Sequence, residues 1–442
     1  MHMLPGYFLR FPFGIISAVL LCLSCTYASG ASARSAGPAH GRHHAHEGLR
    51  RTVTECPAVV NDSSSIRGLL FSPGKELRTS DTATLVFIGD VMLHAGQIAD
   101  AHSRYLAGGG EKNADDHNAY DFSPYLENIR NDLSKADITV ANMEFTLAGP
   151  PFTGYPSFSA PDSYARYAAD CGVDIFLTAN NHICDKGAAG LGRTLDIYSR
   201  MRGSHRVFTA GCTDITVHDS PDILMMRING INTAFLNFTY GTNAPCSHPV
   251  HKVNILEKEA VRQALMKAKE AGADFIIALP HWGDEYSLRH SVYQEEMAEW
   301  MAENGADIII GTHPHVIQDY GTIYVDDSEG QKKVPVVYSL GNIISNMSAR
   351  NTQAGLLLEL TLTKDHSGTT GIGALRFRYT WCSLPGMLSD SYMTVFIEEW
   401  LDRKDEWKTA WGWTKMKDTY QRIIKETGIK DGYAAAEDEE NH

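Results

Sequence analysis

The chain has 442 residues, 43% of them hydrophobic, which is enough for one large domain or two ordinary ones with a sizeable core. Its 39 basic and 53 acidic residues give a formal net charge of −14, and the sequence has no long basic run. This balance argues against nucleic acid as a partner, because proteins that bind nucleic acid concentrate positive charge against the phosphates.

The N-terminus has the pattern of an export signal. Arg10 is the only charge before the apolar stretch FGIISAVLLCLSC, which is short for a membrane span. Small residues follow, so we predict that residues 1–30 are a signal peptide, with an A-x-A cleavage sequence at 31–33, and that the protein reaches the cell envelope. Alternatively Cys25 could carry a lipid anchor, although Cys22 stands where such signals usually have leucine.

Residues 31–80 are predicted to be a flexible linker. They are rich in Gly, Ala, His and Arg and show no apolar periodicity. The four histidines at 40, 43, 44 and 46 could bind metal, but nothing around them imposes a coordination geometry, so we interpret them as part of a solvated tether.

Residues 81–385 alternate between apolar and amphipathic stretches. Apolar runs such as TLVFIGD and DITVANMEF are separated by amphipathic stretches such as YLENIRNDLSKA, the pattern of an α/β domain. An Asn-Gly pair between Ile228 and Ile231 predicts a β-hairpin. Late strand-like runs, including VPVVYSLGNII and GLLLELTL, predict a large and mixed sheet system.

The C-terminal part is predicted to be a helical extension over 386–433 and an acidic tail over 434–442. Trp400, Trp407, Trp411 and Trp413 fit amphipathic helices that pack on the domain. The alternative, an aromatic platform for carbohydrate, competes with the more usual burial of aromatic residues. Of the eight cysteines two lie in the signal, and the other six lack the C-x-x-C spacing of a zinc ribbon and predict no particular disulfide.

Five apolar runs end in side chains that can bind a metal. The ends carry Asp90; Asn142 and Glu144; Asn181 and His182; His281; and His313 and His315. One polar residue after a strand is usually an ordinary turn, whereas five such ends predict a shared site, because open α/β folds place their chemistry at the carboxyl ends of strands. Oxygen and imidazole ligands without thiolates suit one or two divalent ions of Mn, Fe or Zn.

The order of these motifs, followed by YSLGN, resembles the capsule-synthesis protein CapA family over residues 83–379. That family is associated with poly-γ-glutamate capsule synthesis and is related to the calcineurin-like metallophosphoesterases. The resemblance implies an α/β fold, a four-layer sandwich of two mixed β-sheets flanked by helices, with the metal site at the strand ends.

The resemblance also implies individual roles. Asp90 would bind a first metal, Glu144 would bridge two metals, and His315 would return to the first. Asn181, His281 and His313 would hold the second metal. His182 matches the position that protonates the leaving oxygen in the phosphoesterases. Candidates to contact the substrate or to support the ligands are Asn142, Asp284, Glu285 and Asn342.

One position departs from the phosphoesterase pattern. The motif D-x-H would place a histidine at residue 92, where this chain has Met92, and His94 could substitute only if the loop turns back. We therefore expect two metals of unequal affinity, with the weaker one on the Asp90 side.

Two functions follow from these motifs. The first is an exported, metal-dependent hydrolase of the phosphoesterase type that acts on a phosphoester or on a bond in an anionic polymer. The alternative is a non-catalytic accessory protein that binds an anionic capsule polymer during assembly or export, in company with capsule-synthesis membrane proteins. His182 favours the first function, and Met92 at the D-x-H position favours the second.

Overall fold

The structure is a computed structural model that describes residues 70–71, 82–216, 223–327 and 330–433. All of them lie in the compact unit Ser63–His442. The predicted signal peptide, most of the predicted linker and the acidic tail lie outside the described residues. So does Cys56, whereas the five described cysteines, Cys171, Cys184, Cys212, Cys246 and Cys382, are free thiols.

The larger of two main sheets has nine strands, most of them from the first and last thirds of the domain. Its order is β17 (Met393–Phe396), β16 (Thr370–Ser383), β15 (Ala354–Lys364), β2 (Thr82–Val91), β3 (Ile138–Met143), β4 (Ile175–Leu177) and β5 (Phe208–Ala210), with β14 (Asn342–Ile344) paired with β2 and β18 (Gly432–Tyr433) paired with β16. Strands β2 to β5 are parallel, whereas β15, β16 and β17 are antiparallel, so the sheet is mixed.

The second sheet has seven strands from the middle of the chain. Its order is β1 (Leu70–Phe71), β7 (Leu224–Ile228), β8 (Ile231–Thr239), β10 (Phe275–His281), β11 (Ile308–Ile310), β13 (Gly330–Val337) and β12 (Tyr320–Asp327). Strands β8, β10, β11 and β13 are parallel. A separate two-stranded sheet joins β6 (Cys212–Asp214) to β9 (His251–Val253).

The predicted hairpin is confirmed at the start of the seven-stranded sheet. Strands β7 and β8 are antiparallel, and Ile228 pairs with Ile231 across the turn. Asn229 and Gly230 have φ angles of 46° and 90°. Two positive φ angles in a two-residue loop suit the right-handed twist of the flanking strands, which is why Asn-Gly is favoured there.

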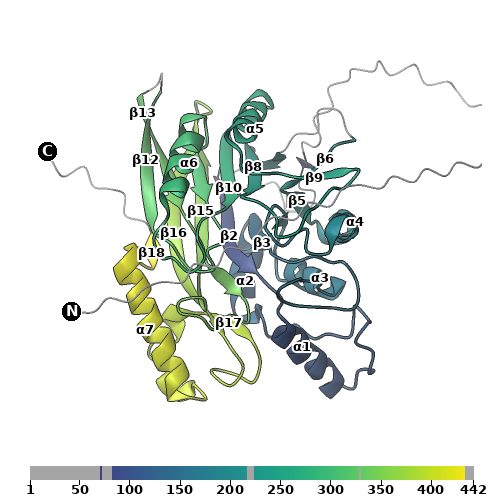
Figure 1. Cartoon of the computed structure of the whole chain (residues 1–442). Coiled ribbons are helices and arrows are strands. Elements are labelled where there is room, and N and C mark those ends of the chain that lie inside the picture. Colours follow the sequence, from purple (N-terminus) through teal and green to yellow (C-terminus); the bar gives the residue numbers. More distant parts are fainter. Residues whose placement is uncertain (1–69, 72–81, 217–222, 328–329, 434–442) are drawn as a thin grey trace, which may run out of the picture. The chain divides into compact units, whose positions relative to one another are not determined.

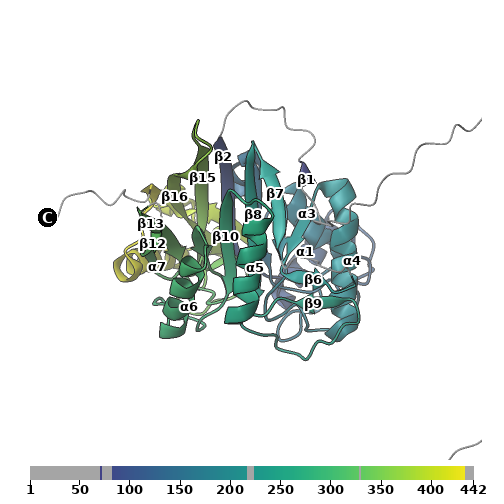
Figure 2. The same cartoon turned by 90° about the horizontal axis from the view of Figure 1, so that it is seen from above.

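Helices cover the outer face of each sheet (Figures 1 and 2). The helices are α1 (Ala95–Ala107), α2 (Arg130–Lys135), α3 (Asp162–Asp170), α4 (Gly187–His205), α5 (Lys258–Glu270), α6 (Val292–Glu303) and α7 (Ala410–Thr427). Helices α1 to α4 pack on the nine-stranded sheet, and α5 and α6 pack on the seven-stranded sheet. None of the helices in the described part of the chain is long and apolar enough to cross a membrane.

A third apolar cluster lies between the two sheets. Phe87 of β2 points into it, whereas its neighbours Val86 and Ile88 face the helices, and Ile277 of β10 alternates with Ile276 in the same way. This period of two is the expected pattern for strands covered on both faces. The predicted four-layer α/β sandwich of two mixed sheets flanked by helices is confirmed.

The C-terminal segment 386–433 contributes more than the predicted helices. Helix α7 begins after Thr409, whose side chain accepts a hydrogen bond from the Gly412 N–H, and it packs on the core between the sheets. Strands β17 and β18, which were not predicted, pair with β16. Among the tryptophans Trp407 is buried, Trp400 and Trp413 pack against the core, and Trp411 is 63% exposed.

Candidate metal centre

The predicted ligands come from both sheets and meet where the strands end. The nine-stranded sheet provides Asp90 near the end of β2, Glu144 directly after β3 and Asn181 in the loop after β4. The seven-stranded sheet provides His281 as the last residue of β10, and His313 and His315 in the loop after β11. Because both sheets bring parallel strands to this edge, residues far apart in sequence become neighbours.

Glycines before two of the ligand positions allow close approach of backbone segments. A Cβ atom at Gly89 would lie 1.8 Å from the carbonyl oxygen of Gly341, which accepts a hydrogen bond from the Asp90 N–H at 2.9 Å. A Cβ atom at Gly311 would lie 2.1 Å from the carbonyl oxygen of Tyr338. Only glycine fits at either place, which explains these residues in the FIGD and IIIGTHPH motifs.

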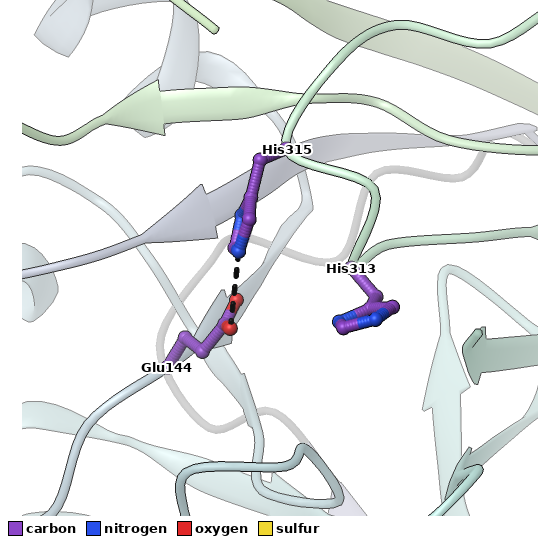
Figure 3. A group of neighbouring side chains, drawn as sticks. All are labelled: Glu144, His313 and His315. Atoms are coloured by element: carbon purple, nitrogen blue, oxygen red, sulfur yellow. Dashed lines mark ion pairs between the residues drawn. The ribbon is translucent and has the colours of Figure 1, made fainter. Parts of the chain in front are cut away.

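Glu144 is completely buried. Its carboxylate faces the ring of His315, with His313 beside them (Figure 3). Its Oε1 atom is 3.9 Å from Nε2 of His281 and 3.8 Å from Nε2 of His315. Among the described residues this oxygen has no hydrogen-bond partner. Its other oxygen accepts a hydrogen bond from Asn142 Nδ2 at 3.1 Å. A buried carboxylate oxygen without a donor is costly, and a cation would satisfy it.

On one side of Glu144 lie Asp90 and His315. The Nδ1 atom of His315 is 3.1 Å from Oδ2 of Asp90 and 3.1 Å from Oδ1 of Asn342. Both of these oxygens are acceptors, so Nδ1 carries the ring proton and Nε2 is left facing Glu144. A carboxylate or carbonyl that orients a histidine through one nitrogen is the usual way to prepare the other nitrogen for a metal.

On the other side lie His281, Asn181 and His313. The Nε2 atom of His281 is 3.0 Å from Oδ1 of Asn181, and its Nδ1 atom is 2.9 Å from the hydroxyl of Thr312. The ring of His313 lies 4.8 Å from that of His281, and its buried Nδ1 atom has no hydrogen-bond partner. A buried and unpartnered imidazole nitrogen beside acceptor atoms is the second position that a cation would satisfy.

The loop that carries the two histidines is held in a strained conformation. His313 has a φ angle of 102° and His315 one of 57°. A residue other than glycine at positive φ costs on the order of 1–3 kcal/mol and persists where the surrounding structure imposes it, often at functional sites. We infer that the loop adopts this backbone conformation because it directs the side chains of His313 and His315 toward the centre.

Burial and mutual repulsion set the charge states of these groups. Burial and the neighbouring Asp90 raise the pKa of Glu144 well above its usual range. Burial, with the nearby His313 and His315, lowers the pKa of His281 far below normal, and burial with His315 lowers that of His313 to about 3. Neutral imidazoles are the form that binds metal.

His315 behaves differently from the other two histidines. Burial alone would lower the pKa of His315, but the hydrogen bond to Asp90 and the charge of Asp90 raise it. The raised pKa of His315 favours its protonated form beside Asp90 more than is the case for His281 and His313. A cation there would replace that proton.

The donor set fits one or two divalent cations. Two groups have ligand atoms that all lie within 4.8 Å of one another, namely Glu144 with His313 and His315, and Glu144 with Asp90 and His281. Both groups contain Glu144, as expected of a bridging ligand. The two groups differ from the predicted division of ligands, in which His313 and His315 bind different metals. The assignment of each ligand to one metal therefore stays a prediction.

Residues 84–347 match the family described as bacterial capsule synthesis protein PGA_cap. The chain belongs to this family. The resemblance to CapA proteins read from the motifs is thereby confirmed.

Individual relatives agree with the family. The capsule biosynthesis protein CapA of Bacillus anthracis is 25% identical over 298 residues, which cover 64% of this chain and 65% of that protein. The PGA biosynthesis protein CapA of Bacillus subtilis is 24% identical over 308 residues, covering 67% of this chain and 72% of that protein. Among solved structures, the NAD nucleotidase NadN of Haemophilus influenzae is 13% identical with a TM-score of 0.40, and the alignment covers 80% of this chain and 65% of that chain.

His182, the predicted proton donor of this family member, is held by a partner that sequence reasoning missed. Its Nδ1 atom is 2.7 Å from Oδ2 of Asp185, which also accepts a hydrogen bond from the Phe158 N–H at 2.8 Å. The ring of Phe158 packs edge-on against His182, with the ring centroids 4.6 Å apart. Asp185 therefore fixes the ring, and its spacing three residues after His182 in NNHICD was the available signal.

The four residues predicted to contact the substrate or to support the ligands differ in their distance from the centre. Asn142 donates to Asp90 at 2.8 Å as well as to Glu144, and Asn342 accepts from His315. Glu285 is exposed but close enough to contribute to the raised pKa of Glu144 and His315. Asp284 is exposed, and no contact with the centre is found for it among the described residues.

Met92 belongs to an apolar cluster, together with its neighbours Val91 and Leu93. Its side chain is buried in the apolar cluster between the nine-stranded sheet and its helices. His94 is the N-cap residue of helix α1. Its ring packs edge-on against Phe158, with the ring centroids 5.3 Å apart, and the same phenyl ring contacts His182. Burial lowers the pKa of His94 to about 4, opposed by a hydrogen bond to Gln97. His94 is thus near the centre, but it is in neither ligand group.

Two exposed tyrosines that sequence reasoning missed lie beside the histidines. The ring of Tyr240, 44% exposed, is 4.6 Å from that of His313. The ring of Tyr286, 47% exposed, is 6.4 Å from that of His315. The metal ligands are therefore buried, and exposed phenol rings border the centre. The sequence did not predict these tyrosines, because each is a single loop residue outside any motif.

Proposed function

We propose that this member of the PGA_cap family is an exported, metal-dependent hydrolase that acts in capsule or poly-γ-glutamate biosynthesis. The observation that carries the proposal is the convergence of Asp90, His281, His313 and His315 on Glu144, with Asn181 beside His281. The Oε1 atom of Glu144 has no hydrogen-bond partner in the described part of the chain. Family membership and the names of the Bacillus relatives support the capsule pathway.

When bound, one or two ions of Mn, Fe or Zn would supply a Lewis acid and an activated water for hydrolysis. Glu144 would bridge the metals, and the histidines would complete their coordination. His182 would move a proton at Nε2, because Asp185 holds Nδ1. Asn243, whose side-chain nitrogen lies 3.5 Å from Nε2 of His182 and whose backbone N–H donates to the Asn181 carbonyl, would help to orient the substrate oxygen.

The substrate that best fits this chemistry is a phosphoester or a bond in an anionic polymer, and the partners would be capsule-synthesis membrane proteins. Export to the cell envelope is part of the proposal and rests on Arg10 and the apolar stretch after it. Mass analysis of the N-terminus of native material should show a chain that begins near residues 31–33, or at a lipid-modified Cys25. An intact Met1 would contradict export.

The test of the activity is a metal analysis of the purified protein combined with a screen of generic phosphoesters and γ-glutamyl peptides. We expect bound transition metal and hydrolysis that rises with added Mn, both lost in Glu144→Gln. The matched control is Glu296→Gln, an exposed carboxylate of α6, which should change neither. Hydrolysis that persists in Glu144→Gln would refute the proposal.

The second candidate function is non-catalytic binding of an anionic polymer during assembly. It is favoured by Met92, which leaves the first metal without the D-x-H histidine. Under this alternative the protein would bind metal and polymer but hydrolyse neither class of substrate, even when saturated with Mn. The same screen therefore separates the two functions.

A further inference from the structure

A basic pocket lies beside the metal centre, between helix α7 and the segment that follows β14. Its volume is about 490 Å³. It is lined by Tyr286, Leu288, Ala349, Arg350, Asn351, Arg422 and Glu426. Five of these seven residues lie after residue 347, where the match to the family ends, so the pocket is built mostly by the C-terminal part of this chain.

Tyr286 connects the pocket to the metal centre. Its backbone N–H donates to the carbonyl oxygen of Pro314, the residue between the two histidines of the loop, at 2.9 Å. The segment that carries Ala349, Arg350 and Asn351 is also connected to the centre. Asn342, which contacts His315, donates a hydrogen bond to the carbonyl oxygen of Thr352, directly after this segment, at 2.9 Å. Tyr286 therefore lies both beside His315 and in the wall of the pocket.

The pocket concentrates positive charge in a protein whose net charge is −14. Arg350 is exposed, and no ion pair is found for it among the residues that the structure describes. Arg422 is held by hydrogen bonds from Nε to Asn351 Oδ1 at 3.0 Å and from Nη2 to Thr419 Oγ1 at 3.1 Å. Both of these partners are neutral, so the guanidinium charge is positioned but not neutralised.

The other charged groups around the pocket are Lys415, Glu426 and Asp418, with Glu285 beside Tyr286. Lys415 of α7 reaches the same segment through Ser348 and Gln353. Burial lowers the pKa of Arg422, and Arg350 acts in the same direction while Asp418 opposes it. Glu426 lines the pocket, but no ion pair joins it to either arginine in the described part of the chain. Cations held near one another without a bridging carboxylate favour an anionic ligand.

We propose that this pocket binds a side carboxylate of a γ-linked glutamate chain while a neighbouring unit of the same chain lies at the metal centre. The proposal rests on the proposed function and names the substrate class for it. The planar guanidinium groups of Arg350 and Arg422 match a carboxylate. Tyr286 and Leu288 offer apolar contact to the methylene groups of a glutamyl unit. The volume exceeds what one carboxylate needs, in keeping with an extended polymer.

The experiment measures the binding of a γ-linked oligoglutamate to the full-length, metal-loaded protein by calorimetry at low and at physiological salt. Arg350→Ala and Arg422→Ala should each weaken binding by about tenfold, the effect of losing one charge-assisted contact, and their salt dependence should be smaller. Metal content and the hydrolysis of a small phosphoester should stay as in the wild type. Arg262→Ala on helix α5, an exposed arginine paired with Glu259, is the control and should bind like the wild type.

Arg350→Ala keeps the test valid if Arg422→Ala fails to fold, because Arg350 is exposed and makes no ion pair. Unchanged oligoglutamate binding in Arg350→Ala would overturn the proposal. Tight binding of polyphosphate without binding of oligoglutamate would also overturn it, since the pocket would then select phosphate. If no substrate is hydrolysed but oligoglutamate binding still depends on both arginines, the hydrolase proposal fails and the pocket assignment stands.

Discussion

The two sheets contribute different chemistry to one centre. The nine-stranded sheet supplies oxygen ligands, Asp90, Glu144 and Asn181, whereas the seven-stranded sheet supplies only imidazoles, His281, His313 and His315. The oxygen side can carry negative charge into the centre. Among the imidazoles, burial lowers the pKa of His281 and His313 and keeps them neutral, whereas Asp90 raises the pKa of His315.

This division means that neither sheet holds a complete site. Each proposed coordination group contains Glu144 from one sheet and at least one histidine from the other. The apolar cluster between the sheets, with Phe87 facing one way and Ile277 the other, therefore sets the distance between the ligand types. Metal binding should stabilise the packing of the two sheets, since only the folded protein presents the site.

The largest effect is expected from Glu144→Gln, which removes the ligand shared by both halves. Bound metal should fall close to zero, measured by elemental analysis after gel filtration. Because burial and Asp90 raise the pKa of Glu144 in the folded state, its ionisation at neutral pH opposes folding, and a neutral glutamine removes that penalty. The metal-free variant should therefore be at least as stable as the metal-free wild type. A variant that keeps its metal would show that Glu144 is not the bridge.

Most of the fold and the ligand set could be predicted because the signals are local. Apolar runs with β-branched residues mark strands, the Asn-Gly pair marks the hairpin, and polar residues directly after strands mark the site. Strand β17, Met393–Phe396, was wrongly placed in the predicted helical extension, because a short apolar run fits a strand and an amphipathic helix equally well. The pocket at Arg350 and Arg422 was also invisible, since it joins residues 72 positions apart that share no motif.

The position of Met92 shows a different limit. The pairing of β2 with β3 shifts register between Ile88 and Asp90. Such an irregularity changes the face to which later side chains point, and Gly89 lies at that position. A motif such as D-x-H assumes a regular strand end, with fixed directions for the side chains. The sequence does not reveal the register shift between Ile88 and Asp90 that changes these directions.

A smaller effect is expected from the histidine side in His313→Gly. Glycine accepts the φ angle of 102°, so the change removes the imidazole without adding backbone strain. We expect bound metal to fall to about half, because the ligands on the Asp90 side remain, and we expect no loss of stability in the metal-free protein. The matched control is Asn229→Gly in the hairpin between β7 and β8, because it also replaces a residue at positive φ, 46°. Unchanged metal stoichiometry in His313→Gly would show that His313 is not a ligand.

The two halves should also differ in affinity. Calorimetric titration of metal-free protein with Mn should reveal one tight and one weaker site, because Met92 leaves the Asp90 side with fewer protein ligands. Activity on a small phosphoester should follow occupancy of the weaker site. Two equally tight sites would contradict the asymmetry.

The smallest effect on the centre is expected from Met92→His. Since Met92 lies in the apolar cluster under the helices, the new histidine cannot reach the metals, and metal content and activity should not change. Burying the polar ring should instead destabilise the protein by about 1–3 kcal/mol, measured by denaturant unfolding. A gain in metal affinity would show that residue 92 does face the centre.

The most direct test of the central claim is a crystal structure of the protein soaked in Mn, with anomalous difference maps that locate the metal. We predict peaks at the junction of the two sheets, within coordination distance of the ligand atoms of Glu144 and of at least one of His281, His313 and His315. Metal peaks that appear only elsewhere, or no peak beside Glu144 in protein that binds Mn in solution, would contradict the account.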